Sequence, residues 1–193
     1  QIGDALIIKR EHAQYVNQVG NSEYESIYKV VPTLMEINRG YTWADITMQG
    51  TNVRFISTHL ESLWDENKTP KAADQARQLV EDVKSTKSPI VLIGDFNSDP
   101  RDPRPLDAPN PGEQPTASEK CPAGASNCNA YKIMRDAGFT DAGPDASEAS
   151  SYTWGMNALL TGADPKRKAA ATEMGNSFGF TDRLDYIFVK NGI

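Results

Sequence analysis

The sequence predicts an α+β domain from two observations. The first half carries short runs of β-branched, aromatic and alternating apolar residues, which indicate antiparallel β-structure. An amphipathic helical pattern then lies between two strand-like runs, and this order is typical of a parallel β-α-β crossover. With 193 residues and 38% hydrophobic side chains, the chain is long enough to fill one core. We therefore expect a single domain over residues 1–193.

The strands expected in the first half are short. Residues 5–8 form an apolar run suited to a buried strand, and residues 26–38 are rich in β-branched and aromatic side chains. Residues 43–48 and 53–58 are two further strand-like runs, separated by the turn-like residues 49–52. The last two runs therefore predict a hairpin.

The crossover is expected in the middle of the chain. Apolar residues recur at helical spacing over residues 72–83, after Thr69 as a candidate N-cap and Pro70 at the first helical position. Residues 90–93 follow and are apolar at every position, which is typical of a strand covered on both faces. Together with residues 53–58, these segments predict a β-α-β unit.

The second half contains a long polar segment and three shorter elements. Residues 97–129 are rich in Pro, Gly, Asn and Asp and indicate a long loop. Residues 130–137, ended by Gly138, predict a short helix. Residues 150–154 and 184–190 are expected to form strands.

Composition excludes several classes of protein. The net charge is -6 with scattered charges, so broad electrostatic binding of nucleic acid is not favoured, although a local basic groove stays open. The longest apolar runs fall far below the roughly 18 residues of a membrane span, so we expect no transmembrane segment. The substrate is not determined by charge.

The two cysteines and the chain ends bear on location. Cys121 and Cys128 lie in one polar stretch, which favours a local disulfide and a secreted or extracytoplasmic protein over two free thiols in the cytosol. The chain opens at Gln1 without an initiator Met and stops at Ile193 just after an apolar alternating segment. We therefore expect truncation at both ends.

The candidate site lies at one edge of the predicted sheet. Parallel strands in a β-α-β unit bring their carboxyl ends to the same edge, where open α/β sheets bind ligands. His59 follows the first of these strands, and Asp95 and Asn97 follow the second, with Gly94 expected to allow a tight turn. An imidazole, a carboxylate and an amide at one edge can stabilise a charged oxygen, activate water and hold a phosphate oxygen.

Three ordered motifs resemble those of the endonuclease/exonuclease/phosphatase superfamily, which has the deoxyribonuclease I-like fold. They are Thr58-His59-Leu60-Glu61, Gly94-Asp95-Phe96-Asn97 and Arg183-Leu184-Asp185-Tyr186-Ile187, and Tyr152-Thr153-Trp154 is also similar to the family. The resemblance implies a four-layer α/β/β/α sandwich, incomplete at the N-terminus and C-terminus. It covers about the C-terminal two-thirds of a family domain.

The resemblance also implies roles in metal-assisted hydrolysis of a phosphate ester, with Mg²⁺ as the usual ion and Mn²⁺ or Ca²⁺ as alternatives. His59 would contact the phosphate and stabilise the pentacovalent transition state. Asp95 would align or deprotonate the attacking water, and Asn97 would fix Asp95 and a phosphate oxygen. Asp185 would orient the family's second histidine.

Substrate and metal ligands complete the expectations. Arg39, Asn97 and Trp154 are candidate substrate contacts, and Asp95 and Asn97 are candidate metal ligands. The family's early Asn, metal-binding Glu and second histidine match nothing in residues 1–193, so we expect this chain to hold about half of the site and to be inactive if it is only a fragment.

Each candidate has a structural alternative. Asp95 and Asn97 could form an Asx turn after a strand. Asp185 could pair with Arg183 or Lys190 on a sheet face. Arg39 could be a solvated surface residue, and Trp154 could be a core aromatic.

The sequence therefore predicts a phosphodiesterase or nuclease, with DNA or RNA as a possible substrate. The alternatives are a non-catalytic binding domain that keeps the fold, a lipid-headgroup phosphodiesterase and a sugar-phosphate phosphatase. The oligomeric state is not predicted.

Overall fold

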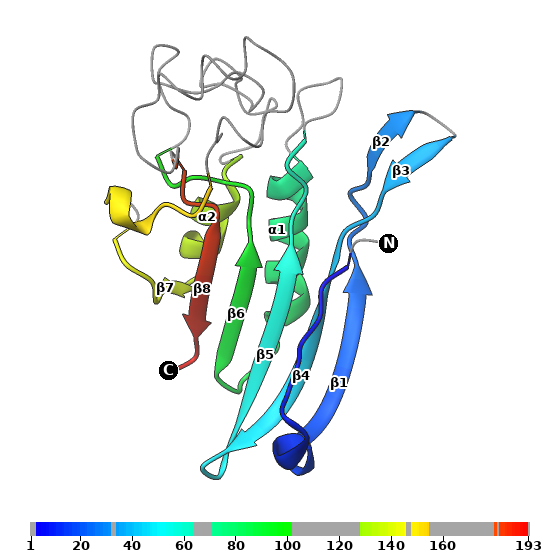
Figure 1. Cartoon of the computed structure of the whole chain (residues 1–193). Coiled ribbons are helices and arrows are strands. Elements are labelled where there is room, and N and C mark those ends of the chain that lie inside the picture. The colour runs from blue at the N-terminus through cyan, green and yellow to red at the C-terminus, as the bar shows by residue number, and fades with distance from the viewer. Residues whose placement is uncertain are drawn as a thin grey trace.

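The computed structural model describes residues 3–31, 34–63, 71–101, 128–145, 148–154, 180 and 182–192. They form a mixed six-stranded sheet in the order β1-β4-β5-β6-β8-β7, with α-helices on one face, and a separate two-stranded sheet, β2-β3 (Figure 1). The fold class is α+β, as predicted. Of the four layers that the family resemblance implies, the described residues form one sheet and the helical layer on one of its faces.

Most elements are β-strands, and only a few helices lie between them in the chain. Their bounds are η1 (Arg10–Tyr15), β1 (Val16–Glu23), β2 (Tyr28–Val31), β3 (Met35–Ile37), β4 (Gly40–Met48), β5 (Thr51–His59), α1 (Lys71–Val83), β6 (Ile90–Asp95), α2 (Ala130–Asp136), β7 (Thr140–Asp141), η2 (Ala149–Ser151) and β8 (Asp185–Lys190). None of the helices described is long and apolar enough to cross a membrane.

The predicted crossover is confirmed. β5 and β6 pair in parallel, and α1 connects them on one face of the sheet (Figure 1). The helix packs closely because Ala73, Ala76 and Leu79, at helical spacing, are fully buried against the strands. Thr69 and Pro70, the expected helix start, lie outside the described residues.

The core lies between the sheet and its helices. Ile56, Leu92 and Phe188 from adjacent strands are fully buried, as is Met134 of α2. Burying each such side chain contributes about 1.5–3 kcal/mol. The opposite face of the sheet is more open in the described part of the chain: Ile93, next to Leu92 and pointing the other way, is 41% exposed. The two faces therefore differ sharply in burial.

The first half contains two β-hairpins, and the one that the sequence predicted is β4–β5. β4 and β5 pair antiparallel, and the turn residues Gln49 and Gly50 have φ values of 49° and 83°. Two consecutive positive φ angles are those of a type I′ turn, whose twist matches the flanking strands. Within residues 26–38, β2 and β3 form the second hairpin.

The expectation of a buried strand at residues 5–8 is wrong. No strand is assigned there, and Ile7 is 95% exposed. A strand needs a partner for its backbone, and the described residues supply none that pairs with this segment. The first strand is instead β1, which sequence reasoning missed because its polar side chains suit a sheet edge rather than a core.

The second half holds one further error and two confirmations. Residues 150–154 do not form a strand, because η2 turns there and the following backbone makes only an isolated bridge between Trp154 and Asp182. α2 begins at the N-cap Asn129, whose side chain accepts a hydrogen bond from the Lys132 backbone, and the chain leaves it through Gly138 at φ 84°. β8 confirms the predicted last strand.

Candidate active site

His59 and Asp95 meet at the carboxyl edge of the sheet. His59 is the last residue of β5 and Asp95 the last of β6, and the two are partners in the parallel register. Their side chains are 35% and 27% exposed, and His59 Nε2 lies 3.4 Å from Asp95 Oδ2. The predicted convergence is confirmed, and it follows from the crossover topology.

Gly94 is required for close approach of the strands rather than for a tight turn. It lies inside β6 opposite Thr58, and a Cβ at this position would come within 2.0 Å of the Thr58 carbonyl oxygen. The expectation of a tight turn at Gly94 is therefore wrong, because this residue lies inside a strand. The absence of a side chain lets β6 approach β5 one residue before the His59–Asp95 pair.

Asn97 locks the end of β6 onto the end of β5. Its backbone N–H donates to Asp95 Oδ1 at 2.8 Å, and its side-chain amide donates to the Leu60 carbonyl at 2.7 Å. Asn97 has a positive φ of 46°, which asparagine tolerates better than most residues. The Asx turn offered as an alternative is thus present, and it is what fixes the Asp95 carboxylate within the site.

Asp185 lies on β8, which flanks β6 on the side opposite β5. It is the first residue of β8 and the antiparallel partner of Asp95. The alternative pairing with Arg183 is not observed, because both Nη groups of Arg183 donate to the Asp141 carboxylate at 2.8 Å. Thr153 Oγ1 accepts the backbone N–H of Asp185 at 3.1 Å and so holds the start of the strand.

The surroundings of Asp95 shift the pKa of its carboxyl group upward. Burial raises the pKa of the Asp95 carboxyl above 3.8, and the negative charge of Asp185 acts in the same direction. The hydrogen bond from the Asn97 backbone and the positive charges of His59 and Arg39 oppose this shift. A carboxyl group with a raised pKa beside an imidazole is suited to proton transfer.

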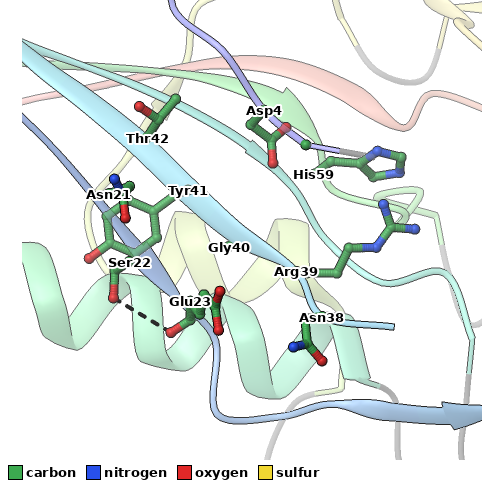
Figure 2. Close-up of a pocket in the computed structure, with 11 residues that line it drawn as sticks. Asp4, Asn21, Ser22, Glu23, Asn38, Arg39, Gly40, Tyr41, Thr42 and His59 are labelled. Atoms are coloured by element: carbon green, nitrogen blue, oxygen red, sulfur yellow. Dashed lines mark hydrogen bonds between the residues drawn. The ribbon is translucent and has the colours of Figure 1, made fainter. Parts of the chain in front are cut away.

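Arg39 is placed beside His59 and is not a solvated surface residue. Its side chain is only 14% exposed, and Nε donates to Glu61 Oε2 at 3.2 Å. Figure 2 shows the Arg39 guanidinium and the His59 ring on the same side of a pocket that both residues line. The structure therefore brings together His59, Asp95 and Arg39.

Asp4 is a site residue that sequence reasoning missed. It lines the same pocket as Arg39 and His59 (Figure 2). Burial raises the pKa of Asp4, and the charges of His59 and Arg39 act against this. Asp4 stands in no motif and in a segment without regular structure, so the sequence offered no signal for it.

One predicted substrate contact, Trp154, is not brought to this pocket. Trp154 is half-buried at its bridge with Asp182 and does not line the pocket beside His59, so its role in substrate binding stays a prediction. The predicted disulfide between Cys121 and Cys128 involves Cys121, which lies outside the described residues. That disulfide also stays a prediction.

A complete metal site is not formed by the described part of the chain. Within it, no group of three or more His, Cys, Asp or Glu side chains could hold an ion. Asp95 and Asn97 supply two oxygen-bearing side chains at most, whereas Mg²⁺ requires six ligands, some of them waters and substrate oxygens. The described residues alone therefore do not make up a metal centre.

Sequence comparison identifies the family. The chain matches the model of the Endonuclease/Exonuclease/phosphatase family over residues 20–193, so it belongs to this family. The motifs that carry His59, Asp95 and Asp185 all lie within the matched range. No curated protein sequence gives a significant match.

Several solved structures are similar to this chain. They include the mannosyl-6-phosphatase Bt3783 of Bacteroides thetaiotaomicron VPI-5482, with 16% identity and a TM-score of 0.46 over 93% of this chain and 55% of that one. Truncated Caenorhabditis elegans TDP2 gives 13% identity and a TM-score of 0.47 over 92% and 53%. The human Nocturnin catalytic domain gives 13% and 0.41 over 92% and 49%. The chain thus spans about half the length of these proteins.

Proposed function

We propose that this protein hydrolyses phosphate esters, and phosphodiesters in particular. The observation that carries the proposal is the 3.4 Å approach of His59 and Asp95 at the carboxyl edge of two parallel strands. Membership of the endonuclease/exonuclease/phosphatase family supports the same class of reaction. DNA and RNA are the first substrates to test.

The site residues divide the chemistry among them. Asp95, held by the Asn97 backbone, orients and deprotonates the attacking water. His59 contacts a phosphate oxygen and stabilises the negative charge that develops in the transition state. Arg39 binds the substrate phosphate through its guanidinium, a group whose planar donors match phosphate geometry. The negative charge of Asp185 on the neighbouring strand adds to the effect of burial, which raises the pKa of Asp95.

A divalent cation and an extracytoplasmic location belong to the same proposal. Asp95 and Asn97 carry the hard oxygen atoms that Mg²⁺ and Mn²⁺ prefer, and a bound ion would stabilise charge on the phosphate. A disulfide between Cys121 and Cys128 would fit an oxidising compartment. Loss of hydrolysis in EDTA, restored by Mg²⁺, would support the metal requirement.

Hydrolysis assays test the proposal directly. The protein is incubated with Mg²⁺ or Mn²⁺ and with bis(p-nitrophenyl) phosphate, DNA or RNA, beside the His59→Ala variant. Hydrolysis that depends on His59 supports the proposal. If none of the three substrates is cleaved, or if His59→Ala cleaves them as fast as the wild type, the proposal fails, and binding without cleavage would favour the non-catalytic alternative.

A further inference from the structure

Glu61 is a buried carboxylate immediately behind the candidate site. It lies two residues after His59, and its side chain is 1% exposed. Its Oε2 accepts from Arg39 Nε at 3.2 Å, and Arg39 in turn lines the pocket beside His59. A fully buried carboxylate is costly unless it is paired, so this contact constrains both side chains.

Glu61 is itself firmly held. Its Oε1 accepts from the Leu63 backbone at 3.2 Å, and its own backbone N–H donates at 2.8 Å to the fully buried Gln75 of α1. Gln75 also donates to the Ser26 carbonyl at 2.8 Å, between β1 and β2. The carboxylate is therefore fixed relative to α1 and to the segment that leads into the β2–β3 hairpin.

The contact leaves the outer part of the Arg39 guanidinium available. Nε points to Glu61, and the Nη1 and Nη2 groups make no hydrogen bond to any residue that the structure describes. The guanidinium lies by the His59 ring in Figure 2. It is also close enough to Asp95 for its positive charge to act to lower the pKa of that carboxyl group. Two neighbouring N–H groups that diverge from one carboxylate are suited to bind two oxygens of a phosphate.

We propose that Glu61 is a positioning residue that holds the Arg39 guanidinium in the orientation that binds the substrate phosphate. A free arginine side chain samples many rotamers, and fixing it before binding removes that entropic cost from the binding step. Glu61 itself does not touch the substrate. This inference rests on the proposed function, because it assumes that the pocket receives a phosphate group.

The experiment is a double-mutant cycle with Glu61→Gln and Arg39→Ala. The values measured are kcat and KM for bis(p-nitrophenyl) phosphate and the Kd of inorganic phosphate by calorimetry. We expect Glu61→Gln to raise KM and the phosphate Kd about tenfold, because a charge-assisted hydrogen bond is replaced by a weaker neutral one. In the Arg39→Ala background the same substitution should change neither value.

A matched control separates positioning from stability. Asp45 is buried and forms a bidentate ion pair with Arg54, with both hydrogen bonds at 2.8 Å. This pair lies toward the β4–β5 turn, away from the His59 end of the strands. Asp45→Asn removes the same kind of charge, so it should lower stability in urea while KM and the phosphate Kd keep their wild-type values. If Glu61→Gln behaves like Asp45→Asn, or if its effect persists without Arg39, the inference is wrong.

A second variant and a binding measurement cover the cases in which Glu61→Gln does not fold or the wild type is inactive. If Glu61→Gln does not fold, Glu61→Asp, which keeps the charge but shortens the reach, should show the same rise in KM and Kd. If the wild type hydrolyses no ester, the proposed function fails, and the phosphate Kd alone then tests Glu61. A wild type that does not bind phosphate, or one whose Kd is insensitive to Glu61, would overturn the inference.

Discussion

Replacing Gly94 with alanine tests whether close approach of β5 and β6 makes the site. The added Cβ would lie 2.0 Å from the Thr58 carbonyl oxygen, whereas ordinary contacts begin at 3.4 Å. The strands must therefore move apart by about 1.4 Å at this point. Overpacking of this kind costs about 1–3 kcal/mol of folding free energy. The shift falls one residue before His59 and Asp95, which are 3.4 Å apart.

The expected result is a combined loss of stability and activity. A misplacement of about 1 Å in an active site lowers the rate about 100-fold, so we expect kcat/KM for bis(p-nitrophenyl) phosphate to fall by at least that factor. Stability is measured by urea unfolding, and activity is assayed well below the unfolding transition. A folded Gly94→Ala variant with wild-type kcat/KM would refute the reasoning.

A second glycine provides the control. A Cβ at Gly50 would meet nothing within 4 Å, but the φ of +83° makes alanine unfavourable there. Gly50→Ala should therefore cost about 1–2 kcal/mol of stability through backbone strain alone. Because Gly50 lies in the β4–β5 turn, at the opposite end of β5 from His59, kcat/KM should be unchanged.

Three further substitutions test the site and its support. His59→Gln should lower kcat/KM about 100- to 1,000-fold, the range for loss of a group that stabilises charge in the transition state, with unfolding in urea little changed. Asp185→Asn removes a charge that raises the pKa of Asp95, so the acidic limb of the pH profile of kcat/KM should move to lower pH; a shift upward would contradict the assigned electrostatics. Burial acts to raise the pKa of Asp99, but hydrogen bonds, chiefly from Arg101, outweigh it and hold that pKa below 3.8. The ionised carboxylate therefore stabilises the fold above pH 3.8, and this contribution is lost as the pH falls through the lower folded-state pKa. Asp99→Asn should be clearly less stable than the wild type near pH 7, with the difference in urea unfolding shrinking as the pH falls below 3.8, and a constant difference would count against the assignment.

The order of motifs along the chain was enough to predict the centre of the site. His59 and Asp95 each follow a run of strand-forming residues, and a helical pattern separates the two runs. A crossover of this kind has one favoured hand and places the carboxyl ends of both strands on the same edge. Local periodicity and this topological rule together determine that the two side chains meet.

The same local reasoning failed where the outcome depends on distant partners. The apolar residues 5–8 form no strand, since strand formation requires a neighbouring backbone that the pattern cannot reveal. Gly94 was correctly singled out, but for a turn, because the proximity of the Thr58 carbonyl is a property of two paired strands. Neither error comes from the local conformational preference of the residues. Both arise because the outcome depends on contacts with another segment of the chain.

The sequence by itself determined the α+β class, the crossover and the pair His59–Asp95, since these follow from short-range periodicity and chain topology. Only the tertiary structure decided that Arg39 pairs with the buried Glu61 and that Asp4 lines the same pocket as His59. The physical reason is that burial and charge pairing depend on contacts between segments far apart in the chain. The sequence pattern of one segment does not reveal which charged side chains of another segment will pair with it.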